Sequence, residues 1–245
     1  MEFEKKRILI TGASSGIGKE TAIRMDKLGA EIIMIARNKK RLSELQNQLQ
    51  QPCRCFSYDL SDMENIHNLF EEITKHGKLD GFIHCAGICK ITPVKALELE
   101  ELLQQMNVNA FSFFQIARFF SNAKYSNKSS SIVALSSIAA YTAEAGMCAY
   151  TMSKATLNAE IRVMAKEFIK RGIRVNAIMP AQVMSKMGEE NNVWEQEELQ
   201  DVKSYQPLGA IPISQIVNSI EFLMSNERAG YITGECLAIT GGYKK

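Results

Sequence analysis

Short apolar runs alternate with longer amphipathic stretches along the whole chain. The apolar runs are about five to seven residues long and rich in Ile and Val, which is typical of strands buried on both faces. These runs predict strands at 7–11, 31–36, 53–59, 79–85, 131–135, 174–178 and 235–239. The amphipathic stretches predict helices at 16–28, 39–50, 62–75, 98–120, 150–171 and 213–224.

The signals at the ends of these stretches agree with the strand and helix pattern. Asn38 and Ser61 are suited to cap the second and third helices. Gly29, Gly77 and Gly172 are suited to end the first, third and fifth helices. Strands alternating with helices predict an α/β fold, with one doubly wound, seven-stranded parallel sheet and helices on both faces.

In such a sheet, right-handed crossovers place the carboxyl ends of all strands at one edge, where ligands bind. No linker, repeat or low-complexity segment divides residues 1–245, so a single domain is expected. The longest irregular stretch lies between Ala181 and Pro212. A long loop inside an α/β domain is typically functional, and we expect a substrate lid at about 183–212.

Composition excludes several classes of protein. The chain has 29 Lys and Arg against 27 Asp and Glu, so its charge predicts neither a nucleic-acid nor a membrane partner. No apolar run approaches the roughly 20 residues of a spanning helix. The N-terminus lacks the apolar stretch of a signal peptide, so a cytoplasmic location is expected. The six Cys and three His show no paired ligand spacing, and no metal site is expected.

A glycine-rich loop follows the first predicted strand and opens the first predicted helix. It reads Gly12-Ala13-Ser14-Ser15-Gly16-Ile17-Gly18. Glycines let the backbone approach phosphates, and the helix N-terminus offers free N–H groups to them. A loop of this kind can also be a plain tight turn, but its position after the first strand favours a dinucleotide site.

A tyrosine and a lysine lie one helical turn apart in the fifth predicted helix. Tyr150 and Lys154 share a helix face because they are four residues apart. A phenol has a pKa near 10, and a nearby ammonium favours the phenolate and lowers that pKa. The pair alone is a common accident on helix surfaces. Ser137, at the end of the preceding strand, adds a hydroxyl that can steady a developing alkoxide.

Taken in order and spacing, these features resemble the short-chain dehydrogenase/reductase family, in its branch of about 250 residues. The features that carry the resemblance along essentially the whole chain are the Thr-Gly-x-x-x-Gly-Ile-Gly loop, Asp59, Asn109, Ser137, Tyr150 and Lys154. The resemblance implies a single-domain Rossmann fold and an oxidoreductase that transfers a hydride at nicotinamide C4.

The resemblance also implies the role of each catalytic residue. Tyr150 would protonate a carbonyl oxygen that Ser137 orients. Lys154 would hold the nicotinamide ribose and keep the pKa of the tyrosine low. Asn109 would hold a water of the proton relay, with Asn107 as the less favoured alternative.

The family pattern further assigns the cofactor-binding residues. They are Gly12, Ser14, Ser15, Gly16, Ile17, Gly18, Arg37, Asp59, Leu60, Ala86, Gly87, Tyr150, Lys154, Pro180, Val183 and Ser185. Two departures stand out. His84 and Cys85 replace the usual pair of asparagines, and Ala181 replaces a glycine in the loop expected to bind the nicotinamide.

The residues after the second strand bear on the choice of cofactor. A carboxylate there would bond the ribose hydroxyls and repel a 2′-phosphate, but the position holds Ala36. Arg37 and a basic stretch at 39–41 follow, and an arginine can fork onto a phosphate. The alternative is a solvated, basic helix start. NADP(H) is therefore favoured, with NAD(H) as the alternative.

Within the family, the chain looks most like the 3-oxoacyl-(acyl-carrier-protein) reductases of fatty acid biosynthesis. Lys128 and Arg171 stand where such reductases dock their acidic carrier. Against this, the predicted lid is acidic around Trp194. The alternatives are a reductase or dehydrogenase of another ketone or alcohol (a sugar, sterol or secondary metabolite), or a non-catalytic NADP(H)-binding regulator. By family expectation, helices 98–120 and 150–171 would form a homotetramer or homodimer.

Overall fold

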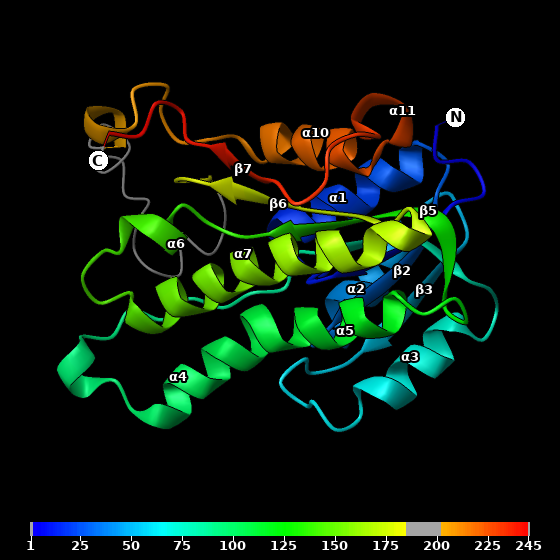
Figure 1. Cartoon of the computed structure of the whole chain (residues 1–245), viewed down its shortest axis with the longest axis horizontal. Coiled ribbons are helices and arrows are strands. Elements are labelled where there is room, and N and C mark those ends of the chain that lie inside the picture. The colour runs from blue at the N-terminus through cyan, green and yellow to red at the C-terminus, as the bar shows by residue number, and fades with distance from the viewer. Residues whose placement is uncertain (1, 185–201, 245) are drawn as a thin grey trace.

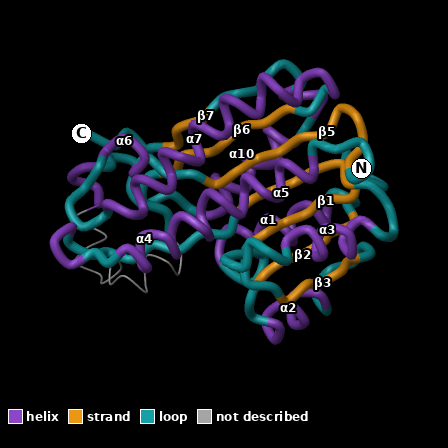
Figure 2. The backbone as a smooth tube through the Cα atoms, turned by 60° about the horizontal axis from the view of Figure 1, so that its bottom comes forward, coloured by secondary structure: helices purple, strands orange, loops and turns teal. Residues whose placement is uncertain are grey.

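Seven strands of the computed structural model, which describes residues 2–184 and 202–244, form one sheet in which all neighbours are parallel (Figure 2). The order across the sheet is β3-β2-β1-β4-β5-β6-β7. The strands are β1 (Arg7–Thr11), β2 (Glu31–Ala36), β3 (Cys53–Ser57), β4 (Leu79–His84), β5 (Ser126–Leu135), β6 (Arg174–Pro180) and β7 (Cys236–Ile239). The predicted doubly wound Rossmann sheet is confirmed.

Helices cover both faces of this sheet (Figure 1). They are α1 (Gly16–Lys27), α2 (Lys39–Gln46), α3 (Ile66–Thr74), α4 (Leu99–Met106), α5 (Ser112–Phe120), α6 (Ala139–Thr142), α7 (Cys148–Phe168), α10 (Ile213–Met224) and α11 (Asn226–Ala229). Alternating side chains of a strand enter two apolar clusters, as β1 shows. Leu9 packs with α3, α5 and α7, whereas Ile8 and Ile10 pack with α1, α2 and α10.

The chain order places a ligand-binding crevice beside β1. From β1 the chain moves outward to β2 and β3, and β4 then returns to the opposite side of β1. The loops after Thr11 and His84 therefore leave neighbouring strands in opposite directions. Such a switch point, at the carboxyl ends of the strands, is where open α/β sheets bind ligands.

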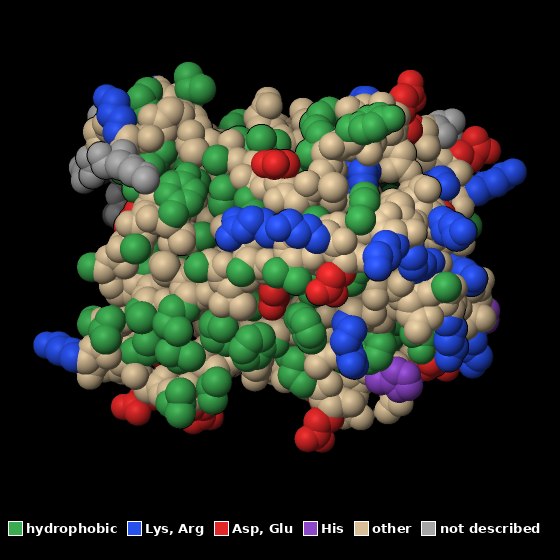
Figure 3. Space-filling model, in the orientation of Figure 1, with side chains coloured by type: hydrophobic (Ala, Val, Ile, Leu, Met, Phe, Trp, Pro, Cys, Tyr) green, Lys and Arg blue, Asp and Glu red, His purple; other side chains and the backbone are tan. Residues whose placement is uncertain are grey.

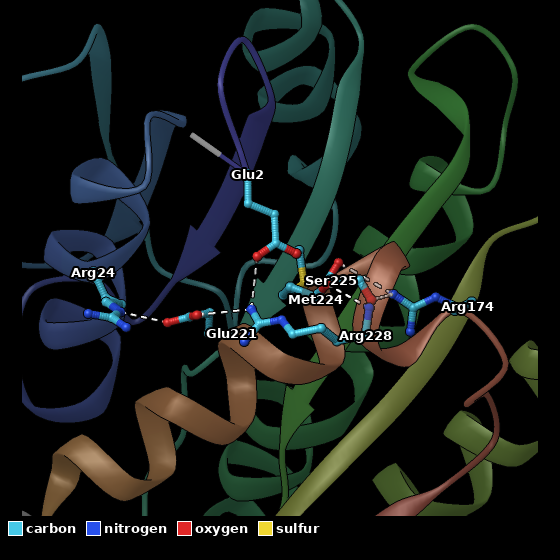
Figure 4. A network of polar contacts seen from close by, with 7 residues as sticks. All are labelled: Glu2, Arg24, Arg174, Glu221, Met224, Ser225 and Arg228. Carbon is cyan, nitrogen blue, oxygen red and sulfur yellow. Dashed lines mark hydrogen bonds and ion pairs between the residues drawn. The ribbon is translucent and has the colours of Figure 1, made fainter.

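An ion-pair network lies where α1, α10 and α11 meet, and a buried arginine at the start of β6 binds the same helix pair (Figure 4). Glu221 of α10 accepts from Arg24 of α1 at 2.6 Å and from Arg228 of α11 at 2.9 Å. Arg174 at the start of β6 donates to the backbone oxygens of Met224 and Ser225 at 3.3 and 3.2 Å. These bonds hold the helix pair α10 and α11 to the sheet and leave the opposite edge free for a site.

Several element boundaries differ from prediction, and three helices show a physical reason. The helix predicted at 98–120 is interrupted by a π-helical turn at Asn107–Phe111. The third helix begins at Ile66, so Ser61 does not cap it; its hydroxyl donates to Asp59 at 2.8 Å. The helix predicted at 39–50 ends at Gln46, and the backbone N–H groups of Gln50 and Gln51 donate to the Asp26 carboxylate instead of to a helix.

Other predicted boundaries agree with the structure. Asn38 caps α2, accepting from the backbone N–H of Arg41 at 2.9 Å. Gly29, Gly77 and Gly172 follow helix ends with positive φ. No described helix has both the length and the apolar character that a membrane span requires.

Candidate active site

A cavity of about 790 Å³ lies at the carboxyl ends of β1, β2 and β4. The predicted cofactor-binding residues that line it are Gly12, Ser14, Ser15, Gly16, Ile17, Gly18, Arg37, Asp59, Leu60, Ala86 and Gly87. Pro180 ends β6, and Val183 is buried in a bridge with Ile211. Neither belongs to the lining, and Ser185 lies outside the described residues. The structure thus brings the residues predicted to bind adenosine and pyrophosphate together around one cavity.

The glycine loop is shaped by close backbone packing and by open space. A Cβ on Gly12, where φ is +67°, would lie 2.7 Å from the backbone nitrogen of Ala86. A Cβ on Gly18 would lie 2.3 Å from the oxygen of Gly12. At Gly16 a Cβ would meet no described atom within 4 Å. The Ser15 side chain makes no capping bond, so the first N–H groups of α1 are free for an anion.

The outer end of the cavity is basic. Ala36, Arg37 and Arg41 all line it. Arg37 precedes the Asn38 cap and Arg41 lies in the first turn of α2, so the two arginines flank the capped helix start at the cavity wall. Arg41 is absent from the predicted site, although the basic stretch at 39–41 indicated it. Two guanidinium groups without a carboxylate at position 36 suit a phosphate.

The end of β5 and the long helix α7 bring the candidate catalytic side chains together. Tyr150 and Lys154, both buried, lie on the inner face of α7. Lys154 Nζ donates to the backbone oxygen of Leu135 at 2.7 Å, which ties α7 to the end of β5. Ser137, two residues beyond Leu135, lies close enough to the Tyr150 hydroxyl to lower its pKa. Ser136 faces the α7 backbone instead, which agrees with the choice of Ser137.

Burial sets the protonation of both side chains. It lowers the pKa of Lys154 to about 8, and nearby Cys85 and Cys89 act weakly against this. Burial and Cys89 raise the pKa of Tyr150 above its ordinary value, and Ser137 opposes them. Lys154 is not among the groups that act on the pKa of Tyr150 in this structure, so the expected lowering of that pKa by the ammonium stays a prediction. Tyr150 is a neutral phenol at physiological pH.

Asn109 clamps three segments at the side of the cavity. Its Oδ1 accepts from the backbone N–H of Ile88 at 2.8 Å, and its Nδ2 donates to Ile88 O at 2.8 Å and to Ser153 Oγ at 2.9 Å. Lys154 and Asn109 both approach Gly87. A Cβ placed on Gly87 would lie 3.4 Å from Lys154 Nζ and 3.5 Å from Asn109 Oδ1, so the two side chains are near each other. The π-helical turn brings Asn109 here, whereas the alternative Asn107 is only partly buried.

A family model described as Enoyl-(Acyl carrier protein) reductase matches residues 12–244. The chain belongs to the short-chain dehydrogenase/reductase family. Curated relatives agree with this assignment. An L-xylulose reductase of Caenorhabditis elegans is 32% identical, with 99% of this chain and 97% of the relative covered. A 3-oxoacyl-(acyl-carrier-protein) reductase of Rickettsia bellii is 32% identical, with 99% and 98% covered.

Solved structures of short-chain dehydrogenases/reductases share the fold. A 4-hydroxyisoleucine dehydrogenase complexed with NADH is 31% identical, with a TM-score of 0.90 and coverage of 98% of this chain and 99% of that one. A short-chain dehydrogenase/reductase from Serratia marcescens superposes with a TM-score of 0.91 at 24% identity over 100% of both chains. The protein is therefore an oxidoreductase of the class that acts on CH–OH groups.

Contacts between distant segments join the described residues on either side of the predicted lid and the C-terminal segment. Gln206 is fully buried; its Nε2 donates to Gln182 O at 3.1 Å and to Gly209 O at 2.6 Å. These bonds join the two described ends of the predicted lid, whose residues 185–201 lie outside the described part of the chain. The Tyr243 hydroxyl donates to Glu144 Oε1 at 2.7 Å, which joins the C-terminal segment to the loop after α6.

The two residues expected to dock an acyl carrier lie at the other edge of the sheet. Arg171 follows α7, and its guanidinium donates to Ser121 O at 2.6 Å and to Ser126 O at 2.8 Å. Lys128 is exposed near the start of β5. Within this chain both are remote from Tyr150, and Arg171 already holds internal carbonyl groups.

Proposed function

We propose that this short-chain dehydrogenase/reductase is an NADP(H)-dependent reductase that converts a ketone to a secondary alcohol. The observation that carries the proposal is the placement of the buried Tyr150 hydroxyl near Ser137 and one helical turn from Lys154, whose Nζ is bonded to the end of β5. Reduction of a carbonyl needs an acid in its protonated form beside the oxygen. Raised by burial, the pKa of Tyr150 favours that form.

The residues around the cavity fit a nicotinamide dinucleotide phosphate. When bound, this cofactor supplies the hydride. The glycine loop and the first N–H groups of α1 would hold the pyrophosphate. Arg37 and Arg41 would hold the 2′-phosphate, which Ala36 does not repel. Asp59 and Leu60 would contact the adenine, and the backbone of Ala86 and Gly87 the adenosine. Pro180, Val183 and Ser185 are proposed for the nicotinamide end.

The protein's own groups then handle the substrate oxygen. Ser137 donates to this oxygen and orients the carbonyl. Tyr150 gives its hydroxyl proton to the same oxygen as negative charge develops there. Lys154 holds the nicotinamide ribose, and its charge stabilises the phenolate left on Tyr150. Asn109 and Lys154 return a proton from solvent.

For the substrate, we propose a 3-oxoacyl thioester, because full-length relatives at 32% identity include a 3-oxoacyl-(acyl-carrier-protein) reductase. A keto-sugar is the second candidate, since an L-xylulose reductase is related at the same identity. The internal bonds of Arg171 weigh against a carrier-docking role for that residue and favour substrates that need no such contact.

We further propose a cytoplasmic homotetramer, or a homodimer, built on α4, α5 and α7. Figure 3 shows hydrophobic side chains gathered over the part of the surface where α4 and α5 lie in Figure 1. On these three helices and the π-helical turn the exposed large apolar residues are Leu99, Leu103, Phe111, Phe114, Met152 and Val163. Burial of such a patch would stabilise a helical interface. Light scattering that shows a monomer at micromolar concentration would contradict this.

NADPH oxidation by the purified protein tests the proposed reaction. We would supply acetoacetyl-CoA, L-xylulose and a panel of other ketones, with NADH as the parallel cofactor and Tyr150→Phe as the control. Turnover with acetoacetyl-CoA supports the oxoacyl substrate, and turnover with L-xylulose alone supports the sugar. Nucleotide binding without turnover of any ketone would favour the non-catalytic regulator.

A further inference from the structure

His84 is a fully buried imidazole at the end of β4, in a position where the family usually has asparagine. Its ring packs against Phe82 and Phe113, with centroids 5.9 and 5.5 Å away. Burial, followed by the charge of Lys154, lowers the pKa of His84 to about 3. The ring is therefore neutral at physiological pH and has one donor and one acceptor nitrogen.

A threonine decides which nitrogen carries the proton. Thr11 Oγ1 lies 2.9 Å from His84 Nδ1 and accepts from the backbone N–H of Ala86 at 3.4 Å. The Thr11 oxygen accepts a hydrogen bond from Ala86, and its own hydroxyl hydrogen can be directed at Nδ1. In that arrangement Nδ1 is the acceptor and the imidazole proton is on Nε2.

The resulting donor points into the protein beside the catalytic machinery. His84 Nε2 is buried, and it has no hydrogen-bond partner of normal geometry among the described residues. An unpaired buried donor costs about 1–3 kcal/mol, so such groups are almost always paired in native proteins. The backbone of Asn109 contacts the ring closely enough to act on its pKa, and it raises that pKa. The π-helical turn is thus the neighbour that can accept.

We propose that His84 Nε2 donates to the main chain of the Asn109 turn, directly or through one water, and thereby positions the proton relay. The inference rests on the proposed function, because a relay matters only if Tyr150 donates a proton in each turnover. His84 does not line the cofactor cavity and is a positioning residue.

The contacts of Asn109 explain how the placement of the π-helical turn would affect the proton relay. A π-helical turn has few intrinsic constraints, so its placement depends on tertiary contacts. The Asn109 side chain holds Ile88 and Ser153 at 2.8–2.9 Å, next to Lys154. A turn released from His84 would shift these bonds and the path by which a proton reaches Lys154. Thr11 and His84 thus join the glycine-loop strand to the relay through one chain of polar contacts.

Two substitutions at position 84 and one neighbouring control test the proposal. His84→Phe keeps a planar ring and removes both nitrogens, whereas His84→Asn keeps a polar donor. Phe82→Leu perturbs the packing of the same ring without touching its polar contacts. Each variant would be compared with wild type for kcat, for the solvent deuterium isotope effect on kcat across pH, and for the Kd of NADPH.

We expect His84→Phe to lower kcat about tenfold, the equivalent of about 1.4 kcal/mol or one hydrogen bond. Its solvent isotope effect should rise, because proton return becomes more rate-limiting, and its Kd for NADPH should stay near the wild-type value. His84→Asn should recover most of kcat, and Phe82→Leu should show the wild-type isotope effect.

Three results would overturn the inference. The first is an unchanged kcat in His84→Phe. The second is an unchanged solvent isotope effect in that variant, and the third is an equal loss of kcat and of NADPH affinity. The second and third results would indicate a purely structural role for His84. A wild-type protein that binds NADPH but reduces no ketone in the panel would instead overturn the proposed function, and this inference with it. The two failures are distinct because the wild type is measured before any variant.

Discussion

The preference for NADP(H) can be tested at the basic end of the cavity. Arg37→Ala and Arg41→Ala each remove one guanidinium from the cavity wall, and the double variant removes both. Two unit charges 4 Å apart attract by about 1 kcal/mol in bulk water and about 4 kcal/mol at an effective dielectric constant of 20. Both arginines are exposed, so the lower part of this range applies.

We therefore expect each single variant to lose about tenfold in kcat/KM for NADPH, the equivalent of about 1.4 kcal/mol. NADH has no 2′-phosphate, so its kcat/KM should stay near the wild-type value. Ala36→Asp should act in the same direction, because a carboxylate repels the phosphate and can bond the ribose hydroxyls of NADH. Lys40→Ala is the matched control, since Lys40 is on α2 but does not line the cavity.

The assay is steady-state oxidation of NADPH and of NADH with one ketone at two salt concentrations. Because the Debye length falls from about 10 Å at 0.1 M salt to about 3 Å at 1 M, the selectivity of the wild type should shrink at high salt. A double variant that keeps the wild-type ratio of NADPH to NADH activity would refute the role of the two arginines. So would an equal loss in Lys40→Ala.

Three further predictions concern catalysis, folding and pH. Tyr150→Phe should lower kcat by about 10²- to 10⁴-fold while NADPH still binds, and a variant with wild-type kcat would exclude Tyr150 as the acid. Gly12→Ala should lower the free energy of unfolding by at least about 2 kcal/mol, because its Cβ meets the Ala86 backbone. In Gly16→Ala the added Cβ meets open space, so this variant should lose less stability than Gly12→Ala while binding NADPH more weakly. Denaturant unfolding compares the two variants, and equal losses of unfolding free energy would contradict the packing argument. Burial raises the pKa of Glu160 from 4.5 to about 8, and its Oε2 has no hydrogen-bond partner among the described residues. The folded state therefore holds the proton more tightly than the unfolded state. The stability that this adds is fully present below pH 4.5 and is lost as the pH rises to 8. Glu160→Gln should therefore raise the melting temperature relative to wild type more at pH 8 than at pH 5, and a pH-independent difference would contradict this.

The sheet and its helices were predictable where one local signal was sufficient. The bounds of β1, β2 and α10 agree with prediction to the residue, because apolar periodicity and turn residues mark both ends. The start of β5 at Ser126 was not predictable, since 126–130 is polar and pairs only because β4 lies beside it. The π-helical turn also has no local signature, because tertiary bonds to Asn109 hold it.

The candidate site shows the same division between motif and packing. The glycine loop between β1 and α1 and the shared helix face of Tyr150 and Lys154 follow from the spacing of these residues in the sequence. The protonation of Tyr150 does not follow from spacing, because it depends on how deeply α7 buries the phenol. In the sequence, His84 is marked only by its departure from the family pattern. Its contact with Thr11 arises because β1 and β4 lie side by side in the sheet.

Burial connects the electrostatics of the site to its direction of reaction. The same low-dielectric surroundings raise the pKa of Tyr150 and lower that of Lys154, so each group is pushed toward its neutral form. A neutral phenol is ready to give up a proton, whereas an alcohol oxidation would need the phenolate. Lys154, with a pKa of about 8, keeps much of its charge at neutral pH and can stabilise the phenolate once it forms. In the proposed reduction, the charge of Lys154 would stabilise the phenolate left on Tyr150, and the proposed relay at Asn109 would return its proton.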